Sequence, residues 1–162
     1  MSLVYELIEL DRSWLEQMSL LEHRAQLSPW TCELIEASLS SVARAWGFVD
    51  RKQTEPCLFG FILVGLVLDQ AEILTVSIEP KNQRQGLGKA LLSGVINVLK
   101  QEGVNSLFLE VRQTNTAGIA LYQQLGFERI GKRKNYYRLN NANKNTSQHP
   151  FEDAWVMKRV FR

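Results

Sequence analysis

Residues 83–89 read Gln83-Arg84-Gln85-Gly86-Leu87-Gly88-Lys89, and they separate a strand-like run from a strongly amphipathic helical run. Two glycines one residue apart let the backbone turn sharply and approach a bound group without a clash from a Cβ atom. A helix start adds unpaired N–H groups and the positive end of the helix dipole, while Arg84 and Lys89 add charge, so the stretch is typical of a phosphate site. The alternative is a plain helix entry with flexible glycines and solvated basic residues, and the strand–turn–helix setting favours phosphate.

The stretch lies inside a predicted strand–helix–strand unit. Residues 71–78 are strand-like and end before Pro80, because proline cannot donate a hydrogen bond to a sheet. Residues 86–102 are helical, with an apolar side made of Leu87, Leu91, Val95 and Val98. Residues 106–112 form the next strand, and a strand–helix–strand connection of this kind predicts that the two strands are parallel.

The rest of the chain supplies antiparallel strands and further helices. Helices are predicted at 12–24, 32–41 and 116–125, and strands at 43–49, 58–68, 127 onward and 153–160. Residues 140–150 are polar and without periodicity, which indicates a surface loop. The sequence therefore predicts an α/β fold, a central mixed sheet with helices on both faces, in a single domain over residues 1–162.

Composition excludes several classes of protein. A net charge of +2 is too small to indicate nucleic acid as a partner, and the basic run Lys132-Arg133-Lys134 alone is a weak signal for it. The chain has two cysteines and two histidines, so no metal site is expected. The longest apolar run, residues 58–68, is too short to cross a bilayer, and the first residues do not resemble a signal peptide. We expect a cytoplasmic protein with no membrane partner.

Several motifs together resemble those of the GNAT superfamily of acetyltransferases. The pattern Gln83-x-x-Gly86-x-Gly88 is similar to the superfamily's pyrophosphate-binding signature for acetyl-CoA. Further matches follow the superfamily's order along the chain: Ile78-Glu79-Pro80, Leu109-Glu110-Val111-Arg112, Asn115 and Ala120-Leu121-Tyr122-x-x-Leu125-Gly126-Phe127. Residues 74–127 resemble the ribosomal-protein-alanine branch, as do Pro29-Trp30, Arg133-x-Asn135-Tyr136-Tyr137 and Glu152-Asp153-Ala154. The resemblance implies the GNAT fold and acetyl-CoA as co-substrate.

The resemblance also implies which residues hold acetyl-CoA. The pyrophosphate would lie on the turn made by Arg84, Gln85, Gly86, Leu87, Gly88 and Lys89. Backbone groups of Val76, Ser77 and Ile78 would pair with the pantetheine arm where this strand bulges and splays from the next one. Asn115 would bond the same arm, although capping of the helix that follows it is the default role for an asparagine there.

Glu110 and Tyr122 are the candidate catalytic residues. A carboxylate inside the apolar strand 106–112 is costly to bury unless it has a role or a partner such as Arg112. The resemblance implies that Glu110 accepts the proton of the acceptor amine and that Tyr122 protonates the departing thiolate of CoA. A solvated or ion-paired glutamate and a core tyrosine are the alternatives. Because neither cysteine lies in a nucleophile motif, direct attack in a ternary complex is the simpler mechanism.

Three aromatic residues are the candidates for acceptor binding. The resemblance implies that Trp30, Tyr136 and Tyr137 line a peptide channel, although such residues are more often part of a core or an interface. Glu152 and Asp153 would either face a positively charged peptide or be solvated. The implied acceptor is the N-terminal alanine of a small-subunit ribosomal protein, but the insertion at 140–150 departs from the branch and leaves that identity open.

Two other functions remain open from the sequence. One is acetylation of lysine side chains or of a small amine, which would demand more of the base because the lysine pKa is about 10.4. The other is a non-catalytic module that binds acyl-CoA as a sensor. The presence of both Glu110 and Tyr122 argues against the second.

Overall fold

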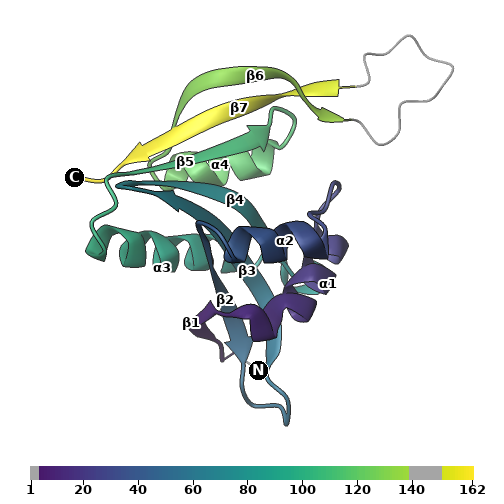
Figure 1. Ribbon diagram of the computed structural model, residues 1–162. Helices are drawn as coiled ribbons and strands as arrows, with labels where there is room; N and C mark the ends of the chain where they lie inside the picture. Colours follow the sequence, from purple (N-terminus) through teal and green to yellow (C-terminus); the bar gives the residue numbers. More distant parts are fainter. Residues whose placement is uncertain (1–3, 139–150) are drawn as a thin grey trace, which may run out of the picture.

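A seven-stranded mixed sheet forms the centre of the protein, with strand order β1-β2-β3-β4-β5-β7-β6 (Figure 1). The computed structural model describes residues 4–138 and 151–162, so the predicted loop at 140–150 lies outside the described residues. The strands pair antiparallel except β4 and β5, which are parallel, as the strand–helix–strand pattern predicts.

Most elements lie where the sequence pattern predicts them. The helices are α1 (Leu15–Ala25), α2 (Cys32–Leu39), α3 (Leu87–Gln101) and α4 (Thr116–Gln124). The strands are β1 (Glu6–Leu10), β2 (Ala43–Asp50), β3 (Cys57–Val67), β4 (Gln70–Ile78), β5 (Ser106–Arg112), β6 (Glu128–Arg138) and β7 (Phe151–Val160). The start of the predicted first helix is instead a 3-10 turn, Arg12–Trp14, capped by Asp11.

The first strand, β1, was missing from the prediction. It is five residues long and pairs along one side with β2, from Glu6 opposite Val49 to Leu10 opposite Ala45. Leu7 and Ile8 are adjacent apolar residues, so the segment lacks the alternation that identifies a half-buried strand. Its existence depends on pairing with a partner strand far along the chain, which no local pattern reports.

Helices cover both faces of the sheet, as predicted (Figure 1). On one face, α1 and α2 contribute Met18, Leu21 and Ile35 to a core with β2 and β3. On the other, α3 and α4 pack a larger core that includes Leu91, Leu99 and Ile119. The buried stripe of α3 follows the helical spacing of its apolar residues.

The parallel strands β4 and β5 separate part-way along their length. Their pairing runs only from Gln70 opposite Ser106 to Ile73 opposite Leu109. Leu74 follows directly and is an extra residue in the β3–β4 ladder, because Leu63 pairs with Thr75 while Val64 pairs with Ile73. A bulge bends its strand and ends regular pairing, so the second half of β4 turns away from β5 and leaves a gap in the sheet.

A second irregularity lies in β6. Arg133 pairs with Ala154 and Tyr137 with Glu152, so more residues of β6 than of β7 lie between these pairs. Asn135 holds this bulge in a left-handed conformation, with φ 55°, and its N–H donates to Asp153 Oδ1 at 2.9 Å. Asparagine is one of the few residues that adopt this conformation readily. The bulge positions Tyr136 and Tyr137 beside the gap between β4 and β5.

Candidate active site

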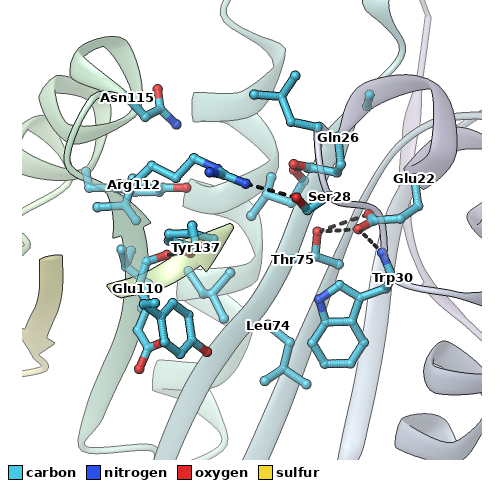
Figure 2. Close-up of a pocket in the computed structure, with 18 of the residues that line it drawn as sticks. Glu22, Gln26, Ser28, Trp30, Leu74, Thr75, Glu110, Arg112, Asn115 and Tyr137 are labelled. Atoms are coloured by element: carbon cyan, nitrogen blue, oxygen red, sulfur yellow. Dashed lines mark hydrogen bonds between the residues drawn. The ribbon is translucent and has the colours of Figure 1, made fainter. Parts of the chain in front are cut away.

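A cavity of about 560 Å³ opens where β4 and β5 separate (Figure 2). Its walls come from α1 and the loop after it, from β4, β5 and β6, and from α4 and the residues just before it. The lining residues are Glu22, Ala25, Gln26, Leu27, Ser28, Trp30, Glu72, Ile73, Leu74, Thr75, Val76, Leu109, Glu110, Val111, Arg112, Thr114, Asn115, Tyr122, Tyr136 and Tyr137. Both candidate catalytic residues and all three candidate acceptor residues therefore line one space.

Glu110 lies on β5 facing the cavity, and its side chain is only 10% exposed. Its ion-pair partner is Arg133, at 2.6 Å from Oε1, and not the Arg112 two residues along the strand. The Tyr136 hydroxyl also hydrogen-bonds to Glu110; this bond and then burial raise the pKa of Tyr136 to about 12. Because the Arg133 side chain is 59% exposed, its contact with Glu110 can exchange with water without leaving a buried cation.

Tyr122 reaches the cavity from α4, with its ring against Phe127 at 5.8 Å between centroids. Burial, and then the neighbouring Tyr137, raise the pKa of Tyr122 to about 12. The hydroxyl therefore keeps its proton throughout the neutral range. The ring also packs against the α3–α4 core, so the core position given as the alternative to catalysis is observed, and it does not keep Tyr122 out of the cavity.

Arg112 forms an ion pair with Glu152, an arrangement that neither alternative expected for Glu152, a peptide contact or simple solvation, included. Arg112 Nη1 lies 2.8 Å from Glu152 Oε1, and the two side chains are 15% and 8% exposed. Burial works to raise the pKa of Glu152, but hydrogen bonds from Arg112 and Thr114 outweigh it, so this pKa lies below its usual value. Asp153 is similarly engaged, by Lys132 at 3.3 Å. Both acidic residues support β6 and β7.

Arg112 also links the two walls of the cavity. Its Nη2 donates to Ser28 Oγ at 3.0 Å, across the gap between β5 and the loop after α1 (Figure 2). Its guanidinium lies 4.3 Å from the centre of the Tyr137 ring, and the Tyr137 hydroxyl donates to the backbone oxygen of Glu110 at 3.4 Å. This network fixes the orientation of Tyr137 beside the candidate base.

Asn115 caps α4, the default role expected from its position. Its Oδ1 accepts from the Gly118 N–H at 2.9 Å, and a Cβ at Gly118 would come within 2.6 Å of Asn115 Nδ2. Since Asn115 lines the cavity, the two N–H bonds of its Nδ2 amide remain for a bound molecule.

Of the three β4 residues expected to bind the pantetheine arm through their backbone, one lines the cavity. Val76 lines the cavity, but Ser77 and Ile78 do not. The backbone oxygen of Val76 accepts from Gln26 Nε2 at 2.6 Å, and that of Ile78 accepts from Gln83 Nε2 at 3.0 Å. A carbonyl oxygen has a second lone pair, so both groups can still accept from a ligand.

The turn at residues 83–89 lies outside this cavity, at the start of α3. Gly86 is the N-cap with φ 80°, a left-handed conformation, and a Cβ there would meet no atom within 4 Å. Arg84 is also left-handed, with φ 63°. Successive turns of this kind point backbone N–H groups toward a common point, an arrangement that binds anions.

Glu22 is the largest omission from the sequence-based site. Its carboxylate is fully buried on α1 and accepts hydrogen bonds from Thr75 and the backbone of Trp30 (Figure 2), and it also accepts one from Ser77. A signal was available, because Glu22 lies four residues after Met18 and so falls on the apolar side of its helix. Glu72, an exposed carboxylate that also lines the cavity, was missed because nothing local marks it.

Residues 4–138 and 151–162 contain no group of three His, Cys, Asp or Glu side chains close enough to hold a metal ion. In the same part of the chain, no helix has the length and apolar character that crossing a membrane requires.

Comparison with known proteins identifies relatives over most of the chain. Residues 4–127 match the acetyltransferase (GNAT) family. The chain is 42% identical over 97 residues to the ribosomal protein bS18-alanine N-acetyltransferase of Escherichia coli strain K12, an alignment that covers 60% of this chain and 60% of that enzyme. The corresponding Salmonella typhimurium enzyme is 36% identical over 118 residues, which cover 72% of this chain and 76% of that one.

Solved structures give the same result. The crystal structure of the E. coli ribosomal-protein-S18-alanine N-acetyltransferase superposes with a TM-score of 0.85 at 30% identity, covering 97% of this chain and 94% of that chain. The fold is also that of Arabidopsis thaliana NAA60, with a TM-score of 0.81 at 18% identity and coverage of 97% and 98%. This chain belongs to the acetyltransferase (GNAT) family.

Proposed function

We propose that this protein transfers the acetyl group of acetyl-CoA to the N-terminal α-amine of a protein whose first residue is alanine. The observation that carries the proposal is the cavity in which Glu110 and Tyr122 lie together beside the separated strands β4 and β5. The acceptor we assign is ribosomal protein bS18, because the E. coli and S. typhimurium relatives are named for that substrate. A ribosomal acceptor fits the cytoplasmic location that the sequence predicts.

The donor would lie along the gap between the strands. The backbone of Val76, Ser77 and Ile78 would pair with the pantetheine arm in place of the missing β5 partner, and the Asn115 amide would add a donor. The turn made by Arg84, Gln85, Gly86, Leu87, Gly88 and Lys89 would hold the pyrophosphate at the positive end of α3. The Val76 and Ile78 carbonyls already accept from Gln26 and Gln83, which fixes them before a donor binds.

Glu110 would accept the proton that the acceptor amine loses. The amine nitrogen forms a bond to the thioester carbonyl carbon, and the bond from that carbon to the CoA sulfur breaks. A terminal α-amine has a pKa of about 7.7–8.0, so a carboxylate within reach of it, directly or through a water, suffices near neutral pH. Withdrawal of the exposed Arg133 side chain would open the carboxylate to the amine.

Tyr122 would supply the proton that the CoA thiolate needs as it departs. A pKa of about 12 keeps this hydroxyl protonated, as an acid must be. Neither Cys32 nor Cys57 lines the cavity, which supports direct transfer between donor and acceptor with no acyl-enzyme intermediate.

The acceptor would enter between the loop after α1 and the bulge of β6. Trp30 lies on one side of the cavity and Tyr137 on the other (Figure 2), and Tyr136 also lines the cavity. The choice of bS18 rests on similarity to relatives such as the E. coli enzyme, of whose length the alignment covers 60%. A peptide panel should therefore test this part of the proposal first.

The decisive measurement is release of free CoA thiol with peptides that begin with Ala, Ser, Met or Gly, beside a peptide whose only amine is an internal lysine. We expect turnover on the alanine peptide at least about 10-fold above the others, a selectivity within reach of pocket contacts. A peptide carrying the N-terminal sequence of bS18 should be the best substrate.

The other outcomes would each discard part of the proposal. Turnover on lysine alone would keep acetyl transfer and remove the N-terminal acceptor. Tight binding of CoA with no turnover on any peptide would favour a small-amine substrate or a sensor module.

Replacing Gly86 by valine should weaken acetyl-CoA binding by about 10-fold or more. The left-handed φ of 80° is open to glycine but costs another residue about 1–2 kcal/mol, and a displaced turn would no longer aim its N–H groups at the pyrophosphate. The dissociation constant can be measured by calorimetry.

Gly103→Val is the matched control, because Gly103 has φ 87° at the other end of α3 and a Cβ there also meets no atom within 4 Å. It should lose similar stability and keep its affinity for acetyl-CoA. Equal affinity in the two variants would remove the turn at 83–89 from the donor site.

A further inference from the structure

Glu22 forms a buried junction between two walls of the cavity. Its side chain has no exposed surface and forms no ion pair within the described part of the chain, but three groups donate to it. The Trp30 N–H lies 3.1 Å from Oε1, and the Ser77 hydroxyl 2.7 Å and the Thr75 hydroxyl 3.0 Å from Oε2. A buried carboxylate is tolerated when such donors replace its water.

The two walls depend on this junction to different degrees. Thr75 and Ser77 belong to β4, whose backbone is held by the ladder to β3 through the pairs Leu63–Thr75 and Phe61–Ser77. Trp30 lies between α1 and α2, outside any ladder, and its backbone N–H donates to Glu22. Loss of the Glu22 carboxylate would therefore release the Trp30 segment and leave β4 in place.

Three further hydrogen bonds and the packing of Trp30 against the α1–α2 core also hold this segment, but none of them binds the Trp30 backbone N–H. Ser28 accepts from Arg112 through its side chain, and Gln26 donates to Val76 and Ser77. These contacts hold the start of the loop, whereas Glu22 holds the backbone of the residue whose indole lines the acceptor side.

We infer that Glu22 is a positioning residue for the acceptor: it fixes the Trp30 segment against β4, so that the amine arrives at the correct place relative to Glu110. The inference rests on the proposed function for the identity of the acceptor and on the three groups that donate to Glu22 for the junction itself. Although Glu22 lines the cavity, its carboxylate is occupied by these hydrogen bonds, so in this inference it acts through Trp30 and not on the amine itself.

The length of the side chain, and not its charge, is the property that matters in this arrangement. A glutamine in place of Glu22 would keep an oxygen for the Trp30 N–H, and its amide could donate to the Thr75 and Ser77 hydroxyls, which accept as well as donate. An aspartate would keep the charge, but it is one methylene shorter and cannot reach the β4 hydroxyls and Trp30 together. The sequence change that preserves charge should therefore be the harmful one.

The test compares Glu22→Gln, Glu22→Asp and Glu22→Ala, with Glu16→Gln on the exposed side of the same helix as the control. Steady-state kinetics should use the peptide that wild-type enzyme acetylates best. Hydrogen exchange of the backbone at 26–31 gives a second readout that needs no turnover. Thermal unfolding identifies any variant that fails to fold.

We expect the Asp and Ala variants to raise the acceptor KM at least about 10-fold, with the acetyl-CoA dissociation constant within about 3-fold of wild type and faster exchange at 26–31. The Gln variant and the Glu16→Gln control should stay close to wild type in all three. If alanine prevents folding, the comparison of Asp with Gln still decides the matter.

Three kinetic results would overturn the inference: Gln as harmful as Asp, an Asp variant with normal acceptor KM, or equal loss of affinity for both substrates. Backbone hydrogen exchange at 26–31 that is as slow in the Asp variant as in wild type would also overturn the inference, whatever the enzyme acetylates. If wild-type enzyme turns over no peptide, the proposed function fails, and the exchange measurement still tests the junction.

Discussion

Glu110→Gln should lower kcat by about 100-fold or more, the scale expected of a group that accepts a proton in the transition state. Glutamine has nearly the same shape but does not take up a proton near neutral pH, so the amine would lose its acceptor. The affinity for acetyl-CoA should persist, because Glu110 lies on β5, whereas the turn at 83–89 lies outside the cavity. Single-turnover kinetics with the best peptide, beside calorimetric binding of CoA, separate the two effects.

Glu72→Gln is the matched control for this variant. Glu72 is a second carboxylate lining the cavity, on the neighbouring strand β4, and we expect its loss to change kcat by no more than a few-fold. A comparable fall in both variants would indicate that the site needs negative charge and not a base at Glu110. Near-normal turnover of Glu110→Gln would remove the role of Glu110 altogether.

Tyr122→Phe should also lower kcat by about 100-fold, because the departing thiolate would lose its proton donor. The fold should be unaffected, since the variant keeps the ring that packs 5.8 Å from Phe127. An equal fall in kcat and kcat/KM is expected for an interaction made only in the transition state. Tyr5→Phe, a hydroxyl deletion at the Tyr5 ring that packs against Phe48, serves as the control and should be fully active.

The pH profile adds a second test of Tyr122. An acid is active below its pKa, and the pKa of Tyr122 is raised to about 12, so this group should not limit the rate on the alkaline side. We expect the wild-type rate to rise as the acceptor amine loses its proton near pH 8 and to stay level up to about pH 10. An alkaline fall near pH 9 that disappears in Tyr122→Phe would contradict a protonated tyrosine with so high a pKa.

Much of the fold follows from local patterns. The apolar spacing of residues 86–102 predicts α3. Proline at 80 marks the end of the preceding strand, and the glycines at 86 and 103 mark the two ends of the helix. These signals are readable because helical periodicity and turn chemistry are properties of adjacent residues. The mixed sheet and its parallel pair follow from the order of those elements. The edge strand β1 was not predicted, because its stability comes from pairing with β2 and not from its own five residues.

The candidate site also has a part that the sequence predicts, the residues themselves, and a part that it does not, their partners. Residue type and motif place Glu110, Tyr122, Asn115, Trp30, Tyr136 and Tyr137, and the fold brings all of them to one cavity. Their partners were not predictable: Glu110 pairs with Arg133 instead of Arg112, and Arg112 is taken by Glu152. Which cation meets which carboxylate depends on the register of β5, β7 and β6, and in particular on the bulge at Asn135.

Short stretches of chain were enough to predict most of the elements, and to propose a turn for phosphate and residues for the chemistry, since each depends on neighbours in sequence. How those residues are held depends on contacts between distant segments. Glu22 meets Ser77 across 55 positions of sequence, and Arg112 meets Ser28 across 84. Such contacts form when the segments pack, so a buried junction like that at Glu22 becomes visible only once helix α1 lies against strand β4.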